Sequence, residues 1–294
     1  MYTLFEDPTV ARTDPDLARK VRSAVELCEQ VIRDVGQQHC ALSFNGGKDC
    51  TVLVHILSAV LRRLNGNQGL PRIAALYITC PSPFAAVERF IDFCVSPMHG
   101  YNLDIISVSG GMKRGIATYL DGGGERRSAS TTTTSSGEGG RPREIKAMFV
   151  GTRRDDPHGP QLAPRSWTDN DWPRVERIHP ILDWTYADVW RFLRSPHLAS
   201  TDTALGIPRD QLAKAWGTTG GGSLGVPYCV LYDQGYTSLG STFNTLPNPE
   251  LRINTGEEEE RGEGRWKPAY MLQDGSLERA GRVENAQQAK GLQT

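Results

Sequence analysis

The stretch ALSFNGGKDCTVLVHIL, residues 41–57, places two glycines, a lysine and an aspartate between two apolar runs. The first run, CALSF at 40–44, is typical of a buried strand, and apolar residues from 50 to 64 repeat at helical spacing. A glycine turn between strand and helix lets backbone approach a ligand, and N–H groups at the helix start attract anions. The stretch therefore predicts a phosphate-binding turn, the alternative being a tight turn with an incidental lysine.

The rest of the chain continues this alternation of strands and helices. Apolar periodicity predicts helices at 14–36, 85–95 and 112–120, and strands at 73–79, 103–109 and 146–152. A further helix is expected after Thr185, where Asp188 has capping-box spacing. Buried strands that alternate with helices indicate an α/β fold, a twisted, mainly parallel sheet with helices on both faces.

Two segments interrupt the pattern. Residues 121–143 hold almost no apolar side chain, and a segment at about 198–225 contains a glycine-rich run. Such compositions cannot bury enough apolar surface to offset the entropy of ordering. We expect two flexible excursions from a single domain that spans residues 1–294.

The composition excludes several classes of protein. Charged residues make up 23% of the chain and the net charge is −1, without the basic excess of proteins that bind nucleic acids or membrane surfaces. No run approaches the roughly 18 apolar residues of a membrane span, and the N-terminus lacks the apolar core of a secretory signal. The six cysteines form no C-x-x-C pair, which is typical of free thiols in a reducing compartment. We expect a cytoplasmic monomer.

The glycine turn does not match the common nucleotide-binding motifs. A P-loop needs Ser or Thr after Gly-Lys, whereas Asp49 follows Lys48 here, and the G-x-G-x-x-G fingerprint is absent. The remaining pattern, S-x-x-G-G-x-D-C from Ser43 to Cys50, resembles the pyrophosphate-binding loop of the ATP pyrophosphatase superfamily. That superfamily includes sulfonucleotide reductases, thiolation enzymes and some adenylyltransferases. A carboxylate directly after the glycines suits Mg²⁺, which prefers oxygen ligands.

Further stretches resemble one family within that superfamily. They are SFNGGKDC (43–50), GTRRDDPHG (151–159), TDNDWPRVERIHPILDW (168–184), GYTSLGSTFNTLPNPEL (235–251) and LERAGR (277–282). These stretches and their order are similar to those of the fungal-type FAD synthetases, or FMN adenylyltransferases, of the PAPS reductase-like family. His158 departs from the family, which tends to carry Phe there. The resemblance implies a Rossmann-like adenine nucleotide α-hydrolase fold whose C-terminal extensions build a flavin pocket.

The resemblance also implies a reaction, AMP transfer from ATP to FMN with Mg²⁺, which yields FAD and pyrophosphate. It implies metal binding by Asp49 and Asp156, although an aspartate before proline is also a common turn former. The phosphates would be held by Ser43, Asn45, Gly46, Gly47 and Lys48 of the loop, by Thr152 and Arg153, and by Arg279 and Arg282. Of these residues, Asn45 and Arg153 are expected to act in catalysis with the two aspartates. Surface ion pairs are the alternative for the arginines.

The same resemblance assigns the base and flavin contacts. Leu42 and Ile78 would flank adenine, their alternative being ordinary sheet core. Trp172 would pack on the isoalloxazine ring, and Asp169 and Arg177 would bond its polar edge, with Ile178 beside them.

Three other functions remain open at this point. A sulfonucleotide reductase shares the loop but needs a redox cysteine, and the late cysteine, Cys229, is unpaired. A thiolation enzyme would need a reactive cysteine pair. A catalytically silent flavin or nucleotide carrier would bind FAD without consuming ATP, and the intact Asp49 and Asp156 argue against it.

Overall fold

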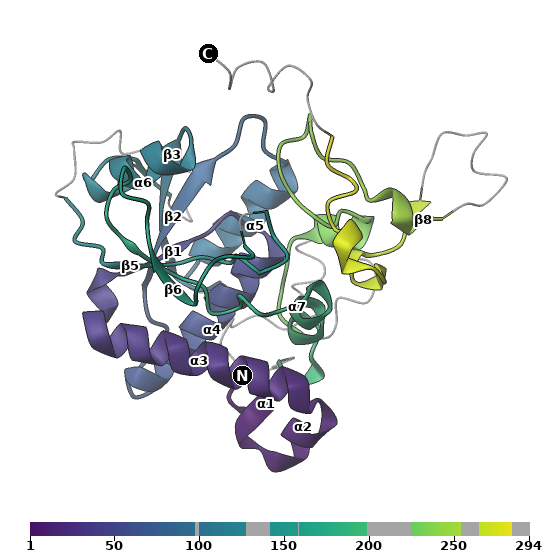
Figure 1. Ribbon diagram of the computed structural model, residues 1–294, viewed down its shortest axis with the longest axis horizontal. Coiled ribbons are helices and arrows are strands. Elements are labelled where there is room, and N and C mark those ends of the chain that lie inside the picture. Colours follow the sequence, from purple (N-terminus) through teal and green to yellow (C-terminus); the bar gives the residue numbers. More distant parts are fainter. Residues whose placement is uncertain (98–99, 128–141, 158, 199–224, 254–264, 284–294) are drawn as a thin grey trace.

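The computed structural model describes residues 1–97, 100–127, 142–157, 159–198, 225–253 and 265–283. Within these residues a seven-stranded sheet has the order β4-β3-β2-β1-β5-β7-β6 (Figure 1). The strands are β1 (Cys40–Ser43), β2 (Ile73–Thr79), β3 (Leu103–Ser109), β4 (Glu125–Arg126), β5 (Ala147–Phe149), β6 (Arg165–Trp167) and β7 (Glu176–Ile178). All neighbours from β3 to β7 pair in parallel, and the edge strands β4 and β6 are antiparallel. The predicted α/β class with a mainly parallel sheet is confirmed.

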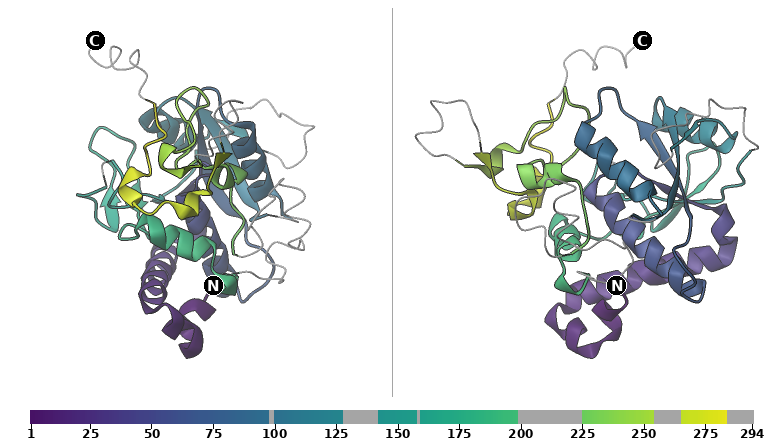
Figure 2. Two further views of the ribbon diagram at one scale, coloured as in Figure 1. Left: turned by 90° about the vertical axis from the view of Figure 1, so that its right-hand side faces the viewer. Right: turned by 180° about the vertical axis from the view of Figure 1, so that it is seen from behind.

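Helices cover both faces of this sheet (Figures 1 and 2). The larger core is formed with α3 (Pro15–Val35), α4 (Lys48–Leu64) and α5 (Ala85–Val95). The smaller core is formed with α6 (Met112–Leu120). The strands divide their residues between the two cores because successive side chains point to opposite faces. Leu42 and Phe149 enter the larger core, whereas their neighbours Ala41 and Met148 enter the smaller one.

An N-terminal arm and the last long helix also contribute side chains to the larger core. The arm consists of α1 (Thr3–Glu6) and α2 (Pro8–Thr13), which the sequence pattern did not predict. Helix α7 (Tyr186–Leu193) begins with the predicted capping box of Thr185 and Asp188. Asp188 is fully buried and also binds Lys20 of α3 at 2.6 Å, which ties α7 to α3. None of the helices in the described ranges is long and apolar enough to cross a bilayer.

Residues 225–253 and 265–283, here called the C-terminal extension, lie beside the sheet (green to yellow in Figure 1). They contain the 3₁₀ helices η3 (Val230–Gln234), η4 (Pro249–Leu251), η6 (Ala269–Met271) and η7 (Gly275–Leu277). The strands β8 (Arg252–Ile253) and β9 (Arg265–Trp266) form an antiparallel pair. Buried polar side chains such as Thr237 and Asn248 hold these irregular segments together.

The first excursion was predicted to begin at residue 121, but the chain is still part of the sheet after that point. Residues 125 and 126 form β4 on β3, and the Arg127 N–H donates to the Ile105 carbonyl at 2.9 Å. The Arg127 guanidinium pairs with Glu88 and with Asp92 of α5. These contacts order a polar stretch that has no apolar pattern. Residues 128–141 and 199–224, which hold the rest of the two predicted excursions, lie outside the described residues, as does His158.

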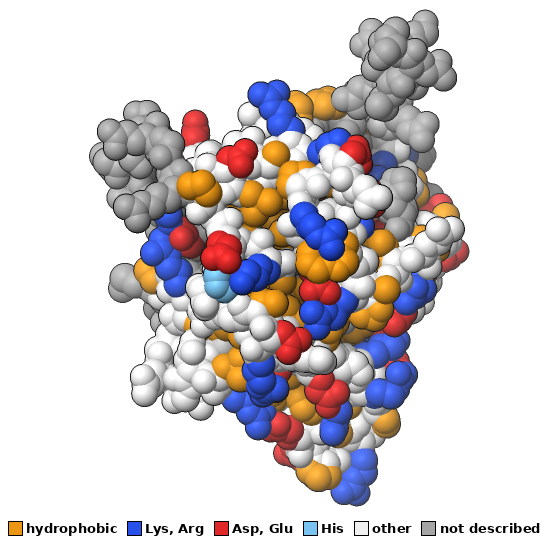
Figure 3. Space-filling view, turned by 60° about the vertical axis from the view of Figure 1, so that its left-hand side comes forward, with side chains coloured by type: hydrophobic (Ala, Val, Ile, Leu, Met, Phe, Trp, Pro, Cys, Tyr) orange, Lys and Arg blue, Asp and Glu red, His pale blue; other side chains and the backbone are white. Residues whose placement is uncertain are grey.

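The surface mixes both signs of charge. On the face shown in Figure 3, Lys and Arg side chains alternate with Asp and Glu, and apolar side chains lie between them. This face carries no basic stripe of the kind that follows a nucleic-acid backbone.

Candidate functional site

The predicted phosphate-binding turn connects β1 to α4 at the carboxyl edge of the sheet, where open α/β sheets bind ligands. Gly46 has φ of 73°, and a Cβ there would lie 3.2 Å from the side chains of Val87 and Ile91. The turn therefore needs glycine both for its backbone angle and for its packing on α5. Across the site, a Cβ on Gly151 would lie 3.0 Å from the backbone of Asp49 and Cys50. The end of β5 thus packs directly against the first turn of α4.

The turn is held by hydrogen bonds of its own. The Asn45 side-chain oxygen accepts from the Gly47 N–H at 2.9 Å and from the Cys50 thiol at 2.8 Å. The Lys48 N–H donates to the Tyr232 hydroxyl at 2.8 Å. Because the Asn45 oxygen is used twice inside the turn, its amide nitrogen is the part left to face a ligand. Asn45 is exposed, so this nitrogen offers two hydrogens to an anion.

A cluster of charged groups lies under the turn. The Lys48 ammonium binds Asp49 at 2.8 Å and also contacts Glu278 of the C-terminal extension. The Arg153 guanidinium lies 2.8 Å from Asp49 and 3.2 Å from Asp156, and it too contacts Glu278. Three carboxylates thus face two cations, and the cluster carries a net negative charge.

Lys48 and Arg153 have ion partners that the sequence interpretation did not foresee. Their side chains are 2% and 1% exposed, and their charged ends are taken up by carboxylates. The Lys48 ammonium also lies 5.4 Å from the ring centroid of Tyr186. Both cations hold the carboxylates from below in this structure, and their direct contact with phosphate stays a prediction.

The two aspartates of the cluster have opposite pKa shifts. Burial alone would raise the pKa of Asp49, but the charges of Lys48 and Arg153 outweigh it and hold the pKa below its usual range. Burial raises the pKa of Asp156, and the charges of Asp49 and Glu278 add to this effect against the opposing Arg153. Asp49 is therefore the more firmly ionised of the two, because it has both cations beside it.

A pocket of about 360 Å³ opens above this cluster. The predicted site residues that line it are Ser43, Asn45, Gly47, Lys48, Asp49, Ile78, Thr152, Asp156 and Arg279. The pocket lies between the ends of β1, β2 and β5 on one side and the C-terminal extension on the other. The structure thus brings together the loop, both predicted metal ligands and one of the two late arginines.

Other predicted site residues belong to the core. Leu42 and Ile178 are both fully buried in the larger core and do not line the pocket, so the expected ligand contact at these two positions stays a prediction. Their positions in β1 and β7 point them under the helices, as the period of two requires. Gly46 is likewise turned toward α5 rather than into the pocket.

The predicted flavin residues lie near the pocket but outside its lining. Trp172 packs on the smaller core together with Ile78 and Val150, two residues that do line the pocket. Arg177 lies 3.7 Å from Asp169, and it donates to the Trp167 carbonyl at 2.9 Å. All three predicted residues thus belong to the β6–β7 region at the pocket's edge.

The two late arginines take different positions. Arg279 lines the pocket, whereas Arg282 is partly buried and donates to the Thr245 hydroxyl at 2.8 Å. Its guanidinium lies against Gly240, where a Cβ would come within 2.0 Å of it. Burial lowers the pKa of Arg282, and the charge of Arg279 adds to this.

Two residues of this site were missed by the sequence interpretation, Tyr232 and Glu278. Their contacts with Lys48 join positions 184 and 230 residues apart in the chain. A signal for Glu278 was present, because it lies inside the LERAGR stretch that supplied both arginines. For Tyr232 the sequence held no comparable signal.

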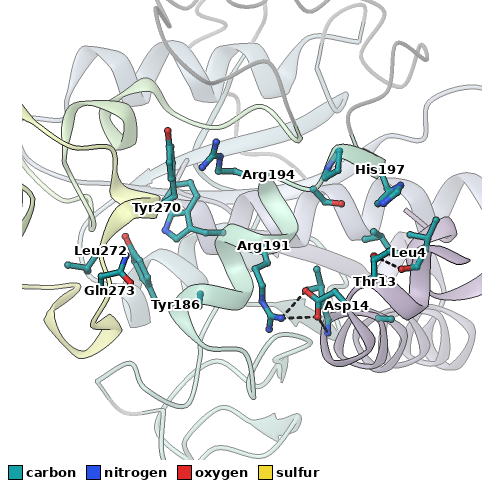
Figure 4. A pocket seen from close by; sticks show the side chains of 17 residues that line it. Leu4, Thr13, Asp14, Tyr186, Arg191, Arg194, His197, Tyr270, Leu272 and Gln273 are labelled. Atoms are coloured by element: carbon teal, nitrogen blue, oxygen red, sulfur yellow. Dashed lines mark hydrogen bonds and ion pairs between the residues drawn. The ribbon is translucent and has the colours of Figure 1, made fainter.

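A second, larger hollow of about 710 Å³ lies where α7, the N-terminal arm and η6 meet (Figure 4). Arg191 extends toward Asp14, with both carboxylate oxygens at 2.8 Å, and Tyr270 and Arg194 border the other end (Figure 4). No residue of the phosphate-binding turn lines this hollow. The ion pairs at this hollow join α7 to the start of α3. We therefore interpret these charged residues as structural.

Comparisons with known proteins identify the family of this chain. The family model of the phosphoadenosine phosphosulfate reductase domain matches residues 39–201, more than half of the chain. The chain is 34% identical to the probable FAD synthase of Caenorhabditis briggsae over 91% of its own length, but it spans only 40% of that protein. It is 31% identical to the probable FAD synthase of Schizosaccharomyces pombe, with 90% of this chain and 80% of that protein covered.

A solved structure shares the fold along nearly the whole chain. The crystal structure of Candida glabrata FMN adenylyltransferase matches with a TM-score of 0.69 and 24% identity, covering 97% of this chain and 95% of that one. A second structure of that protein holds FAD and inorganic pyrophosphate. The family model and the fission yeast relative show that the chain belongs to the FAD synthases of the phosphoadenosine phosphosulfate reductase domain family.

Proposed function

We propose that this chain makes FAD by transferring AMP from ATP to FMN. A phosphate oxygen of FMN attacks the α-phosphorus of ATP, the bond from that phosphorus to the bridging oxygen breaks, and pyrophosphate leaves. The observation that carries the proposal is a single pocket lined both by the loop from Ser43 to Cys50, which includes Asp49, and by Asp156. The relationship to a probable FAD synthase over 80% of its length supports the choice of substrates.

Asp49 and Asp156 would hold a divalent metal ion, for which Mg²⁺ is the natural candidate. The donor set fits, because two carboxylates, Asp49 and Asp156, line the same pocket. The excess negative charge of the cluster also favours a cation. When bound, the ion would neutralise charge on the phosphates as they approach each other. Among the described residues no group of three or more His, Cys, Asp or Glu side chains has metal-site geometry, so water and phosphate oxygens would complete the coordination.

The phosphates would be met by neutral donors and one cation. Asn45 offers its amide nitrogen, Ser43 and Thr152 border the pocket, and Arg279 adds a positive charge. Lys48 and Arg153 would act on catalysis indirectly, by holding Asp49 and Asp156 in place. Arg282, whose guanidinium lies against Gly240, would add a second positive charge to that of Arg279. Such preorganised groups are the main source of rate in phosphate transfer, which needs little covalent help.

The flavin would lie at the β6–β7 edge of the pocket. Trp172 packs beside Ile78 and Val150, so a ring stacked on it would reach the pocket that holds the phosphates. Asp169 and Arg177 would bond the polar edge of the ring after exchanging their mutual contact of 3.7 Å. Adenine would then take the apolar side at Ile78. We further propose that the chain acts as one domain, as a monomer and in the cytoplasm.

Reduction of a sulfonucleotide, the activity in the name of the matching family model, fits the cysteines poorly. That chemistry needs a reactive thiolate. The late cysteine, Cys229, is fully buried, and burial raises its pKa to about 12. The thiol of Cys50 is bound to Asn45, and burial raises its pKa to about 12 as well.

The test is direct. Purified protein is incubated with ATP, Mg²⁺ and FMN, and the products are separated by chromatography. FAD and pyrophosphate should form in equal amounts, and riboflavin, which has no phosphate to attack with, should give no dinucleotide. Failure to form FAD at any Mg²⁺ concentration would remove the proposal, and release of sulfite from a sulfonucleotide in the presence of a thiol would replace it.

The flavin position has a test with a matched control. Trp172→Ala should raise the KM for FMN at least about fivefold, because stacked aromatic area is lost, and should leave the KM for ATP nearly unchanged. Trp167→Ala, in the same hairpin, removes an indole that is 49% exposed and should change neither constant. If the Trp172 variant altered only the ATP dependence, the ring would bind elsewhere.

A further inference from the structure

Tyr232 reaches the phosphate-binding turn from the C-terminal extension. It lies in η3, its side chain is 2% exposed, and its hydroxyl borders the 360 Å³ pocket. The hydroxyl accepts the N–H of Lys48, the first residue of α4, at 2.8 Å. A Cβ on Gly47 would lie only 3.6 Å from the same oxygen. The phenol is therefore placed at the point where anions approach a helix N-terminus.

The hydroxyl still has a hydrogen to donate. A tyrosine hydroxyl carries one donor and can accept through its lone pairs. The Lys48 N–H uses the accepting side, and no acceptor for the hydroxyl hydrogen is found among the described residues. Burial, with the charge of Asp49 nearby, raises the pKa of Tyr232 well above its usual range, so the phenol stays protonated.

The residues around Tyr232 fix its ring in place and make its hydroxyl a stronger hydrogen-bond donor. The ring packs edge-on against Trp190 at 5.4 Å and against Tyr228 at 6.3 Å between centroids. Accepting an N–H at the positive end of a helix draws electron density from the oxygen, which strengthens its own O–H as a donor. The cations nearest the turn, Lys48 and Arg153, are already bound by carboxylates.

We propose that the Tyr232 hydroxyl donates a hydrogen bond to the polyphosphate of the bound nucleotide and so extends the N-terminus of α4 by one group. The Lys48 N–H, which would otherwise face the anion directly, acts through this hydroxyl. The proposal deepens the proposed function, since it rests on a nucleotide at this turn. It makes the C-terminal extension part of the phosphate site through a residue outside the recognised motifs.

The experiment measures the affinity of the full chain for inorganic pyrophosphate and for ATP by titration calorimetry in the presence of Mg²⁺. Tyr232→Phe removes the hydroxyl alone and should weaken both ligands about tenfold, the usual effect of losing a hydrogen bond to a charged acceptor. The affinity for FMN should stay within twofold. Tyr228→Phe is the matched control, because its hydroxyl donates to Asp233 at 2.9 Å and does not line the pocket.

The outcomes separate the two proposals. Unchanged pyrophosphate and ATP affinities in Tyr232→Phe, from a chain that still makes FAD, would overturn the role of the hydroxyl and leave the proposed function standing. Equal losses in Tyr232→Phe and Tyr228→Phe would also overturn it, because packing and not donation would then be responsible. A wild-type chain that binds neither ATP nor pyrophosphate would overturn both proposals.

Discussion

The sheet and the C-terminal extension meet at one pocket but are built by different means. In the sheet half, strands such as β2 and β3 run for seven residues each and send alternate side chains into two apolar cores. In the extension, the described elements are 3₁₀ helices and two-residue strands. There, Asn248 is fully buried and donates to Thr237 at 2.9 Å and to the Leu277 carbonyl at 2.8 Å.

This difference explains how the site divides its work. The sheet half supplies a rigid edge with the turn, Asp49 and Asp156, whose positions follow from strand register. The extension supplies Tyr232, which is held by aromatic packing, and Glu278 and Arg279, which lie beside buried hydrogen bonds. The Thr237 hydroxyl, for example, donates to the Glu278 carbonyl at 2.6 Å. Changes at the sheet edge should therefore affect chemistry, while changes in the extension should affect chemistry and stability together.

The largest effect is expected at the sheet edge. Asp49→Asn keeps the shape of the side chain but removes the charge that would hold the metal, and it should lower kcat at least about 10²-fold. The loss should appear at saturating ATP and FMN and should not be restored by more Mg²⁺. Steady-state FAD formation is the measurement.

Asp155→Asn provides the control for this variant. Asp155 is exposed and precedes Asp156, so it tests a carboxylate of the same loop that does not line the pocket. Its turnover should stay within about twofold of wild type. Equal turnover of Asp49→Asn and wild type would show that the metal site had been assigned to the wrong carboxylate.

Most of the sheet half was predictable because its signals are periodic. The strands at 73–79 and 103–109 have the predicted limits, and the helix at 112–120 does too. The strands β4, β6 and β7, of two or three residues each, were missed. The strand predicted at 146–152 was found as β5, but it covers only Ala147–Phe149. The short helices α1 and α2 were missed because they are too short to show a helical period.

The site was predictable where a motif named its residues and unpredictable where folding joined distant parts. The motif found the turn and Asp49, and the resemblance found Asp156 and Arg279. Neither shows that Lys48 and Arg153 are turned inward, because this depends on Glu278, 230 residues from Lys48. A sequence pattern gives the type of a side chain, whereas its partner is decided by tertiary contacts.

The second prediction uses pH to compare the two aspartates. Burial raises the pKa of Asp156, so it takes up a proton at a higher pH than an ordinary aspartate and then loses its value as a metal ligand. On the acid side, kcat/KM should fall about tenfold per pH unit below that pKa. Higher Mg²⁺ should move this limb to lower pH, since metal competes with protons. An acid limb that does not respond to Mg²⁺ would assign it to another group.

The third prediction tests the extension through Glu278. Glu278→Gln removes one negative charge from the buried Lys48 and Arg153, so both cations lose an ion partner. We expect kcat to fall about tenfold and the free energy of unfolding to fall by roughly 1–3 kcal/mol, as for other disrupted buried networks. FAD formation and chemical denaturation measure the two effects.

Glu250→Gln is the control for Glu278→Gln, because Glu250 is an exposed glutamate of the same extension. It should change neither quantity. A stability loss in Glu278→Gln with unchanged kcat would mean that the extension is only a support and that the sheet edge holds Asp49 and Asp156 without it.

The smallest effect is expected at Asn248, which has no contact with the pocket. Asn248→Ala leaves the Leu277 carbonyl and the Glu250 N–H without their partner, which should lower the free energy of unfolding by about 1–3 kcal/mol. Because Asn248 donates to the carbonyl of the residue before Glu278, kcat should fall as well, but less than in Glu278→Gln.

The matched variant in the sheet half is Asn65→Ala, at an exposed asparagine after α4. Its free energy of unfolding should stay within about 0.5 kcal/mol of wild type. Equal denaturation midpoints for the two variants would contradict the view that the buried polar contacts of Asn248 inside the extension contribute to stability.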